Sequence, residues 1–92
     1  MSDVVIMFYG KECPHCKVMM PLVDRLVKDE KVKIKKLEVW HSEENATAMR
    51  SYGPVIKTAC GGFFGTPTFI KGERALCGEC SYEELKKWAT QK

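Results

Sequence analysis

Apolar residues occur in short runs and stripes that predict alternating strands and helices. Residues 4–9 form a continuous apolar and aromatic run that ends at Gly10, which is typical of a strand buried on both faces of a sheet. From Pro14 onward the spacing changes, and apolar residues recur at i, i+3, i+4, i+7 and i+8. This second pattern predicts an amphipathic helix whose apolar stripe comprises Met19, Leu22, Val23, Leu26 and Val27.

The middle of the chain has weaker patterns. Residues 32–40 mix apolar side chains with lysines and predict a second strand nearer the edge of the sheet. Ser42 is expected to be the N-cap of a short second helix, which the Gly-Pro pair at 53–54 should end. Residues 53–66 show no clear pattern, so we expect a long loop there, and loops of that length are often functional.

The last third of the chain predicts a hairpin and a final helix. Residues 68–70 and 74–76 flank a Lys-Gly-Glu connection, and residues 81–84 form a capping box ahead of apolar residues at helical spacing. The expected order is therefore β-α-β-α-β-β-α. Such an order predicts an α/β fold with a four-stranded mixed sheet flanked by helices, built as a single domain over residues 1–92.

Composition and charge exclude several classes of protein. The chain is 45% hydrophobic and 29% charged, which is ordinary for a globular domain. The net charge of +3 is too small to predict a nucleic-acid partner. The apolar run at residues 4–9 is too short to span a membrane or to serve as a signal sequence. We therefore expect a cytoplasmic monomer with no nucleic-acid or membrane partner.

The cysteines change this picture, because the chain contains five of them. In cytoplasmic proteins stable disulfides are rare, and cysteine pairs more often serve redox or metal chemistry. Four of the cysteines form two C-x-x-C pairs, Cys13/Cys16 and Cys77/Cys80, and Cys60 stands alone. This spacing predicts a function that is based on the chemistry of cysteine sulfurs.

The first pair lies where a strand ends and a helix is expected to begin. Pro14 suits the first helical position, so Cys13 is expected at the N-cap, with its sulfur facing free backbone N–H groups and the positive end of the helix dipole. Such surroundings lower a cysteine pKa from about 8.5 to between about 3.5 and 7.5. We predict that Cys13 is the attacking thiolate and that Cys16, one turn further on, is the resolving cysteine.

Three neighbours of Cys13 are expected to tune its thiolate. Pro14 sets its position at the helix start. His15 can donate a hydrogen bond or a positive charge to the sulfur, which would make the cysteine pair more oxidising, or it can point into solvent. Lys11 is expected to add positive potential, and Glu12 to oppose it.

These motifs resemble the thioredoxin superfamily over nearly the whole chain. The resemblance rests on the strand, the C-x-x-C at a helix start, Pro21 five residues after the second cysteine, the Thr66-Pro67-Thr68 segment and Gly78 after the hairpin. It implies a thioredoxin fold in which Pro67 is a cis-proline facing the active-site sulfurs. It also implies that the backbone of Thr66 pairs with an incoming peptide or glutathione.

The sequence departs from thioredoxins in two places and is similar to glutaredoxins in others. Met7 stands where thioredoxins usually have a buried aspartate, and Glu12 replaces the tryptophan that commonly precedes the motif. Residues 9–14 look like a glutaredoxin. Residues 77–81 fall where glutaredoxins carry a Gly-Gly segment for glutathione, and one of those glycines is present. Glutathione is therefore retained as an alternative co-substrate.

The sequence predicts a protein-disulfide oxidoreductase of the thioredoxin or glutaredoxin type. Its expected partners are protein disulfides or dithiols and a recycling reductase, with no cofactor beyond the Cys13–Cys16 disulfide. The alternatives are a glutathione-linked reductase, a thiolate metal-binding module, and an interaction domain whose dithiol is only a redox sensor. The metal-binding module would use both C-x-x-C pairs, but a separation of about 60 residues is far from the usual spacing of a zinc ribbon.

The remaining cysteines leave several interpretations open. Cys77 and Cys80 are expected on the same side as the active site, where they would form either a second disulfide or an inert dithiol. For Cys60 we favour a small buried apolar residue over a third active-site thiol.

Overall fold

The structure is a computed structural model that describes residues 4–61 and 65–91. Its elements follow the order β1 (Val5–Tyr9), α1 (Pro14–Glu30), β2 (Ile34–Glu38), α2 (Glu43–Arg50), α3 (Gly53–Cys60), β3 (Thr68–Lys71), β4 (Arg74–Cys77) and α4 (Tyr82–Thr90). The strands form one sheet in the order β2-β1-β3-β4. β1 pairs with β2 in parallel and with β3 antiparallel, and β3 pairs antiparallel with β4. The predicted four-stranded mixed sheet is confirmed.

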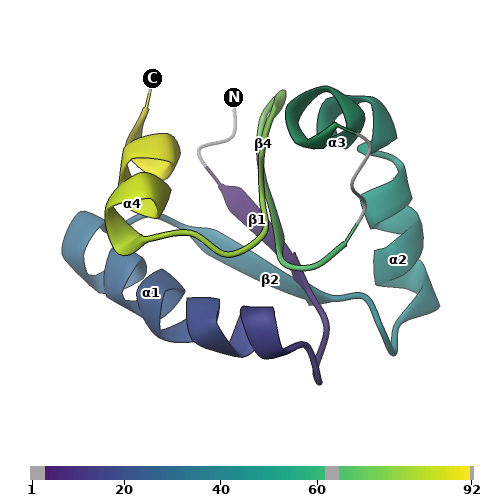
Figure 1. Ribbon diagram of the computed structural model, residues 1–92, viewed down its shortest axis with the longest axis horizontal. Helices are drawn as coiled ribbons and strands as arrows, with labels where there is room; N and C mark the ends of the chain where they lie inside the picture. The colour runs from purple at the N-terminus through teal and green to yellow at the C-terminus, as the bar shows by residue number, and fades with distance from the viewer. Residues whose placement is uncertain (1–3, 62–64, 92) are drawn as a thin grey trace.

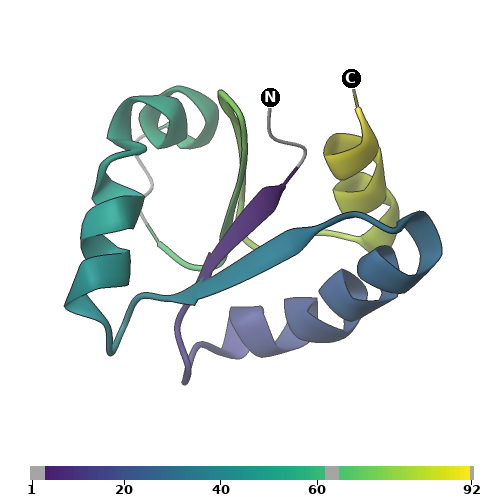
Figure 2. The same ribbon diagram turned by 180° about the vertical axis from the view of Figure 1, so that it is seen from behind.

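Helices cover both faces of the sheet, with α1 and α4 on one side and α2 and α3 on the other (Figures 1 and 2). The central strand β1 contributes to both layers. Val5 and Met7 pack with residues of α1 and α4, whereas Phe8 packs with Met49 of α2 and Ile56 of α3. Burial on both sides explains why residues 4–9 read as a continuous apolar run.

The expected loop over residues 53–66 is wrong for its first part, because residues 53–60 form α3. We interpreted the Gly-Pro pair as a stop signal, but Pro54 occupies the first turn of α3. Proline is tolerated there because its missing N–H would have no partner within the helix. The described residues therefore contain one more helix than predicted. Residues 62–64 of the expected loop lie outside the described residues.

The second strand is shorter than the expected span of 32–40. β2 covers Ile34–Glu38 and lies at the edge of the sheet, with β1 as its neighbour. Lys35 and Lys36 are exposed, and Lys36 forms an ion pair with Asp24 of α1 at 3.0 Å. The lysines therefore lie on an edge strand that is only partly buried, which accounts for the weak pattern.

A disulfide between Cys60 and Cys77 joins the end of α3 to the end of β4, with a Cα–Cα distance of 6.0 Å. Cys77 and Cys80 therefore form neither the second disulfide nor the inert dithiol that the sequence left open, and the favoured interpretation of Cys60 as an unpaired apolar residue is wrong. Both errors follow from the missed helix, because α3 packs against β4 and brings Cys60 to Cys77. Cys80 is a free, half-buried thiol.

The last helix, α4, begins as the sequence predicts. Ser81 and Glu84 form the predicted capping box at the start of α4. No described helix combines the length and the apolar character needed to cross a lipid bilayer.

Removal of the Cys60–Cys77 disulfide should destabilise the fold. The bond spans a sequence separation of 17 residues, and closing a loop of this size removes about 3 kcal/mol of chain entropy from the unfolded state. Replacing both cysteines by serine should lower the free energy of unfolding by about that amount in urea titrations of oxidised protein. Cys80→Ser is the matched control and should cost less than about 1 kcal/mol. Equal stability of the double variant and the wild type would contradict the bond.

Candidate active site

Cys13 is the N-cap of α1, as its position before Pro14 predicted. The backbone of Cys13 is extended, and Pro14 occupies the first helical turn. The Cys16 N–H donates a hydrogen bond to the Cys13 sulfur at 3.3 Å. The Cys13 sulfur therefore accepts a backbone hydrogen bond where the helix dipole favours negative charge.

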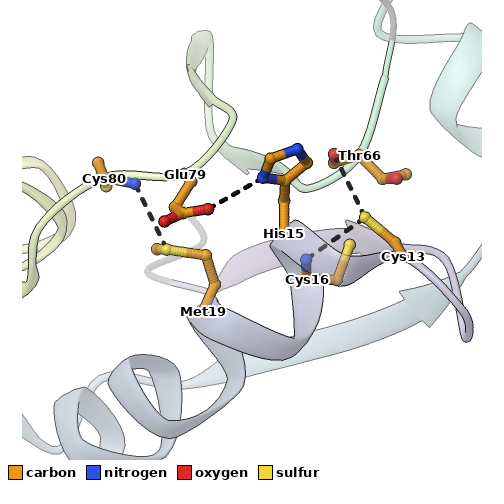
Figure 3. A network of polar contacts seen from close by, with 7 residues as sticks. All are labelled: Cys13, His15, Cys16, Met19, Thr66, Glu79 and Cys80. Atoms are coloured by element: carbon orange, nitrogen blue, oxygen red, sulfur yellow. Dashed lines mark hydrogen bonds and ion pairs between the residues drawn. The ribbon is translucent and has the colours of Figure 1, made fainter.

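The Thr66–Pro67 segment lies opposite this helix start, and its peptide bond is cis. The cis-proline implied by the thioredoxin resemblance is therefore confirmed. The Cys13 thiol donates to the Thr66 carbonyl oxygen, with a sulfur–oxygen distance of 3.6 Å, as Figure 3 shows. The Pro67 carbonyl accepts a 2.8 Å hydrogen bond from Gly78 N–H. Gly78 has a φ of +79°, which favours glycine at this position.

The surroundings of Cys13 favour its ionised form. Burial is the largest single influence and opposes ionisation, since only 3% of the residue is exposed. Hydrogen bonds with the side chains of Cys16 and Thr66 and with the backbone at the helix start together outweigh burial, so the pKa of Cys13 is lowered. The direction agrees with the expectation for a sulfur at a helix N-terminus.

Cys16 responds in the opposite direction. The residue is 1% exposed, and burial, followed by its hydrogen bond with Cys13, raises the pKa of Cys16 to about 11. At neutral pH Cys16 therefore carries its proton while Cys13 is the more acidic thiol. The two sulfurs are chemically distinct in the way that an attacking and a resolving cysteine require.

His15 contacts a residue that the sequence did not predict. Its Nδ1 lies 2.9 Å from Glu79 Oε2, on the connection between β4 and α4. The imidazole therefore contacts Glu79 instead of donating a hydrogen bond to Cys13 or pointing freely into solvent, and the third expectation, a positive charge that acts on Cys13, stays a prediction. The hydrogen bond to Glu79 raises the pKa of His15. Glu79 lies between Cys77 and Cys80, and no local pattern in the sequence indicates its contact with His15.

Glu38 is the second functional candidate that sequence reasoning missed. Its carboxylate accepts hydrogen bonds from the backbone N–H groups of Lys11, Trp40 and His41 at 2.8, 3.1 and 2.7 Å. Glu38 thereby ties the turn that precedes Cys13 to the end of β2. Lys11 is exposed, and its expected electrostatic role stays a prediction.

Glu12 and His41 strengthen the same connection. His41 Nε2 lies 2.6 Å from Glu12 Oε1, and their mutual contact raises the pKa of His41 and lowers the pKa of Glu12. Glu12 therefore has an imidazole partner of its own, and the sequence had suggested no role for His41. The Trp40 ring covers Gly10 so closely that a Cβ there would lie 2.3 Å from the ring, which explains the glycine.

A pocket of about 220 Å³ adjoins Thr66 on the side of α2. Most of its lining is apolar, and one cationic side chain is present. The lining residues are Val39, Trp40, Ala46, Met49, Arg50, Gly65 and Thr66.

The arrangement of the cysteines does not fit the four-sulfur metal site considered from the sequence. Cys77 is bonded to Cys60 and is not free to act as a thiolate ligand. In residues 4–61 and 65–91, no group of three or more His, Cys, Asp or Glu side chains is arranged to hold a metal ion.

The structure thus brings together a thiol with a lowered pKa at a helix N-terminus, a buried second thiol one turn further on and a cis-proline segment opposite. The Thioredoxin family model matches residues 1–62, which is more than half of the chain. The chain belongs to the thioredoxin family.

The chain was also compared with curated protein sequences and with solved structures. No curated protein sequence matches the chain. Among solved structures, the crystal structure of methanoredoxin from Methanosarcina acetivorans is similar with a TM-score of 0.59, at 19% sequence identity. The match covers 97% of this chain and 85% of that chain. At this level of identity the likeness shows the fold alone, and it confirms the thioredoxin-like architecture.

The pKa difference between the two active-site thiols predicts a stepwise titration. In reduced protein, thiolate absorbance near 240 nm should first rise with a midpoint below the ordinary cysteine value of about 8.5. Cys13→Ser should abolish this first step. Cys80→Ser should retain it, because burial raises the pKa of Cys80. A first midpoint at or above 8.5 would contradict the effect of the helix start on Cys13.

Proposed function

We propose that this protein is a protein-disulfide oxidoreductase in which Cys13 attacks and Cys16 resolves. The observation that carries the proposal is the position of the Cys13 sulfur, which accepts the Cys16 N–H at the start of α1 and contacts the Thr66 carbonyl. A lowered pKa increases the fraction of Cys13 that is present as the nucleophilic thiolate. The thioredoxin family membership supports thiol-disulfide chemistry at this pair.

The reaction begins with the Cys13 thiolate and a disulfide in the partner protein. Cys13 attacks one partner sulfur, forms a mixed disulfide with it, and the other partner sulfur leaves as a thiolate that takes up a proton. Cys16 then loses its proton and attacks Cys13, which releases the second partner thiolate. The Cys13–Cys16 pair is oxidised to a disulfide, and the partner gains two electrons. The reverse sequence oxidises a partner dithiol.

Cys16 is activated by the first step itself. The pKa of Cys16 is raised by burial and, beyond that, by its hydrogen bond and charge interaction with Cys13. When Cys13 enters a mixed disulfide, it carries neither a charge nor a thiol, so these two effects disappear. The pKa of Cys16 then falls at the stage when its thiolate is needed. Because Met7 occupies the buried position on β1, this mechanism does not depend on a carboxylate there.

A protein substrate fits the surroundings of Thr66. The Thr66 backbone lies beside Cys13, where an extended peptide can pair with it, and the apolar pocket next to it can receive a side chain near the partner cysteine. Arg50 at this pocket favours an acidic neighbour in the partner sequence. A recycling reductase is the expected second partner. The exchange uses the Cys13–Cys16 disulfide itself and requires no separate prosthetic group.

The glutathione-linked alternative has weaker support. The β4–α4 connection contains a single glycine, Gly78, and its N–H is already bonded to Pro67. This N–H is not free to bind a small tripeptide.

The cytoplasmic location and the monomeric state stay predictions.

Trapping the mixed disulfide tests this function. Cys16→Ser should retain the attacking thiolate but not the resolving thiol, so it should accumulate a covalent adduct with a disulfide substrate such as insulin on non-reducing gels. Cys13→Ser should form no adduct and should reduce insulin at least about 1,000-fold more slowly than the wild type, because removal of a catalytic nucleophile costs at least that much. Cys80→Ser is the matched control and should keep the wild-type rate. Adducts that form equally well with Cys13→Ser would contradict the assignment.

A further inference from the structure

An ion pair connects the first turn of α1 to the segment between β4 and α4. His15 Nδ1 and Glu79 Oε2 are 2.9 Å apart, although the residues are separated by 64 positions in the sequence. In the close view of Figure 3 the imidazole lies between Glu79 on one side and Cys13 on the other. The disulfide exchange described above assigns no task to Glu79.

The structure holds Glu79 in place through both of its neighbours. Gly78 N–H donates to the Pro67 carbonyl at 2.8 Å, and Cys80 N–H donates to the Met19 sulfur at 3.5 Å. One contact fixes the segment to the cis-proline, and the other fixes it to α1. The carboxylate of Glu79 is therefore held above the first turn of α1, within reach of His15.

We propose that Glu79 is a positioning residue of the redox site, which holds the His15 imidazole in its charged form near Cys13 through the Nδ1–Oε2 contact. The inference rests on the proposed function, because it concerns the same cysteine pair. A cation near Cys13 stabilises its thiolate and therefore the reduced pair. Glu79 thereby makes the Cys13–Cys16 disulfide a stronger oxidant.

The charges around His15 explain why a carboxylate is needed. A cation at a helix N-terminus is disfavoured by the helix dipole, so His15 by itself would tend to be neutral. The hydrogen bond to Glu79 is the main cause that raises the pKa of His15, and the charge of Cys13 contributes in the same direction. Since this interaction is mutual, the imidazolium also stabilises the Cys13 thiolate. Cys16 and Cys80, the nearby thiols on α1 and on the β4–α4 connection, have raised pKa values and stay neutral near pH 7.

The first experiment measures the redox equilibrium of the Cys13–Cys16 pair in a glutathione buffer at pH 7. Glu79→Gln keeps the shape of the side chain but removes its charge, and should shift the equilibrium about threefold toward the disulfide, the size expected of an exposed ion pair. Alkylation of Cys13 by iodoacetamide at the same pH should slow. The matched control is Glu73→Gln, which removes the same charge from the exposed turn between β3 and β4. It should leave both measurements unchanged.

The second experiment asks whether Glu79 acts through His15. The ring of His15 should titrate by NMR at lower pH in Glu79→Gln than in the wild type, toward the ordinary imidazole value of about 6.5. In a His15→Gln background, Glu79→Gln should have no further effect on the redox equilibrium, because the imidazole through which Glu79 acts is already absent. High salt should reduce the difference between wild type and Glu79→Gln, since the pair is exposed.

The outcomes separate this inference from the proposed function. An unchanged His15 titration in Glu79→Gln would overturn the inference, and so would an equal redox shift in the presence and absence of His15, which would mean that Glu79 acts directly on the thiols. If the wild type fails to form a Cys13–Cys16 disulfide in the buffer, the proposed function itself is wrong. The His15 titration then still reports whether Glu79 holds the imidazole in its charged form.

Discussion

The site depends on one contact, between the start of α1 and the segment that enters β3. β1 and β3 are antiparallel neighbours. The C-terminal end of β1 and the N-terminal end of β3 therefore lie side by side at one end of the strands. Cys13 follows β1 and Thr66 precedes β3, and this topology brings them to 3.6 Å although 53 residues separate them. The central pairing of the sheet therefore brings the Cys13 sulfur to the backbone of Thr66.

Position along α1 makes the two thiols unequal. Cys13 lies at the helix start and is stabilised as a thiolate by hydrogen bonds, whereas Cys16 lies one turn further on, where burial dominates and raises the pKa. Each thiol influences the other, so a change in the bonding of Cys13 also changes the acidity of Cys16. The order that we propose for the two chemical steps thus follows from the positions of the two sulfurs along one helix.

Local signals predicted the parts of the site that depend on neighbouring residues. A proline directly after Cys13 was enough to place that cysteine at an N-cap, and the resemblance to thioredoxins was enough to expect a cis bond at Pro67. Contacts across the sheet gave no such signal. Glu38 and Glu79 are isolated acidic residues in the sequence, and only the fold brings them to the turn before Cys13 and to His15. The Gly-Pro pair at 53–54 was ambiguous, because proline both follows helices and begins them.

The second C-x-x-C motif illustrates why spacing alone does not define chemistry. Two cysteines three residues apart can form a disulfide only if the intervening backbone bends them together. Here Cys77 ends a strand and is bonded to α3, whereas the backbone of Cys80 is bonded to Met19 of α1. The two residues therefore connect the segment to opposite faces of the sheet, and Gly78 between them bonds the cis-proline. These bonds fix the connection beside the first C-x-x-C, so the second motif has a structural role here that its spacing does not indicate.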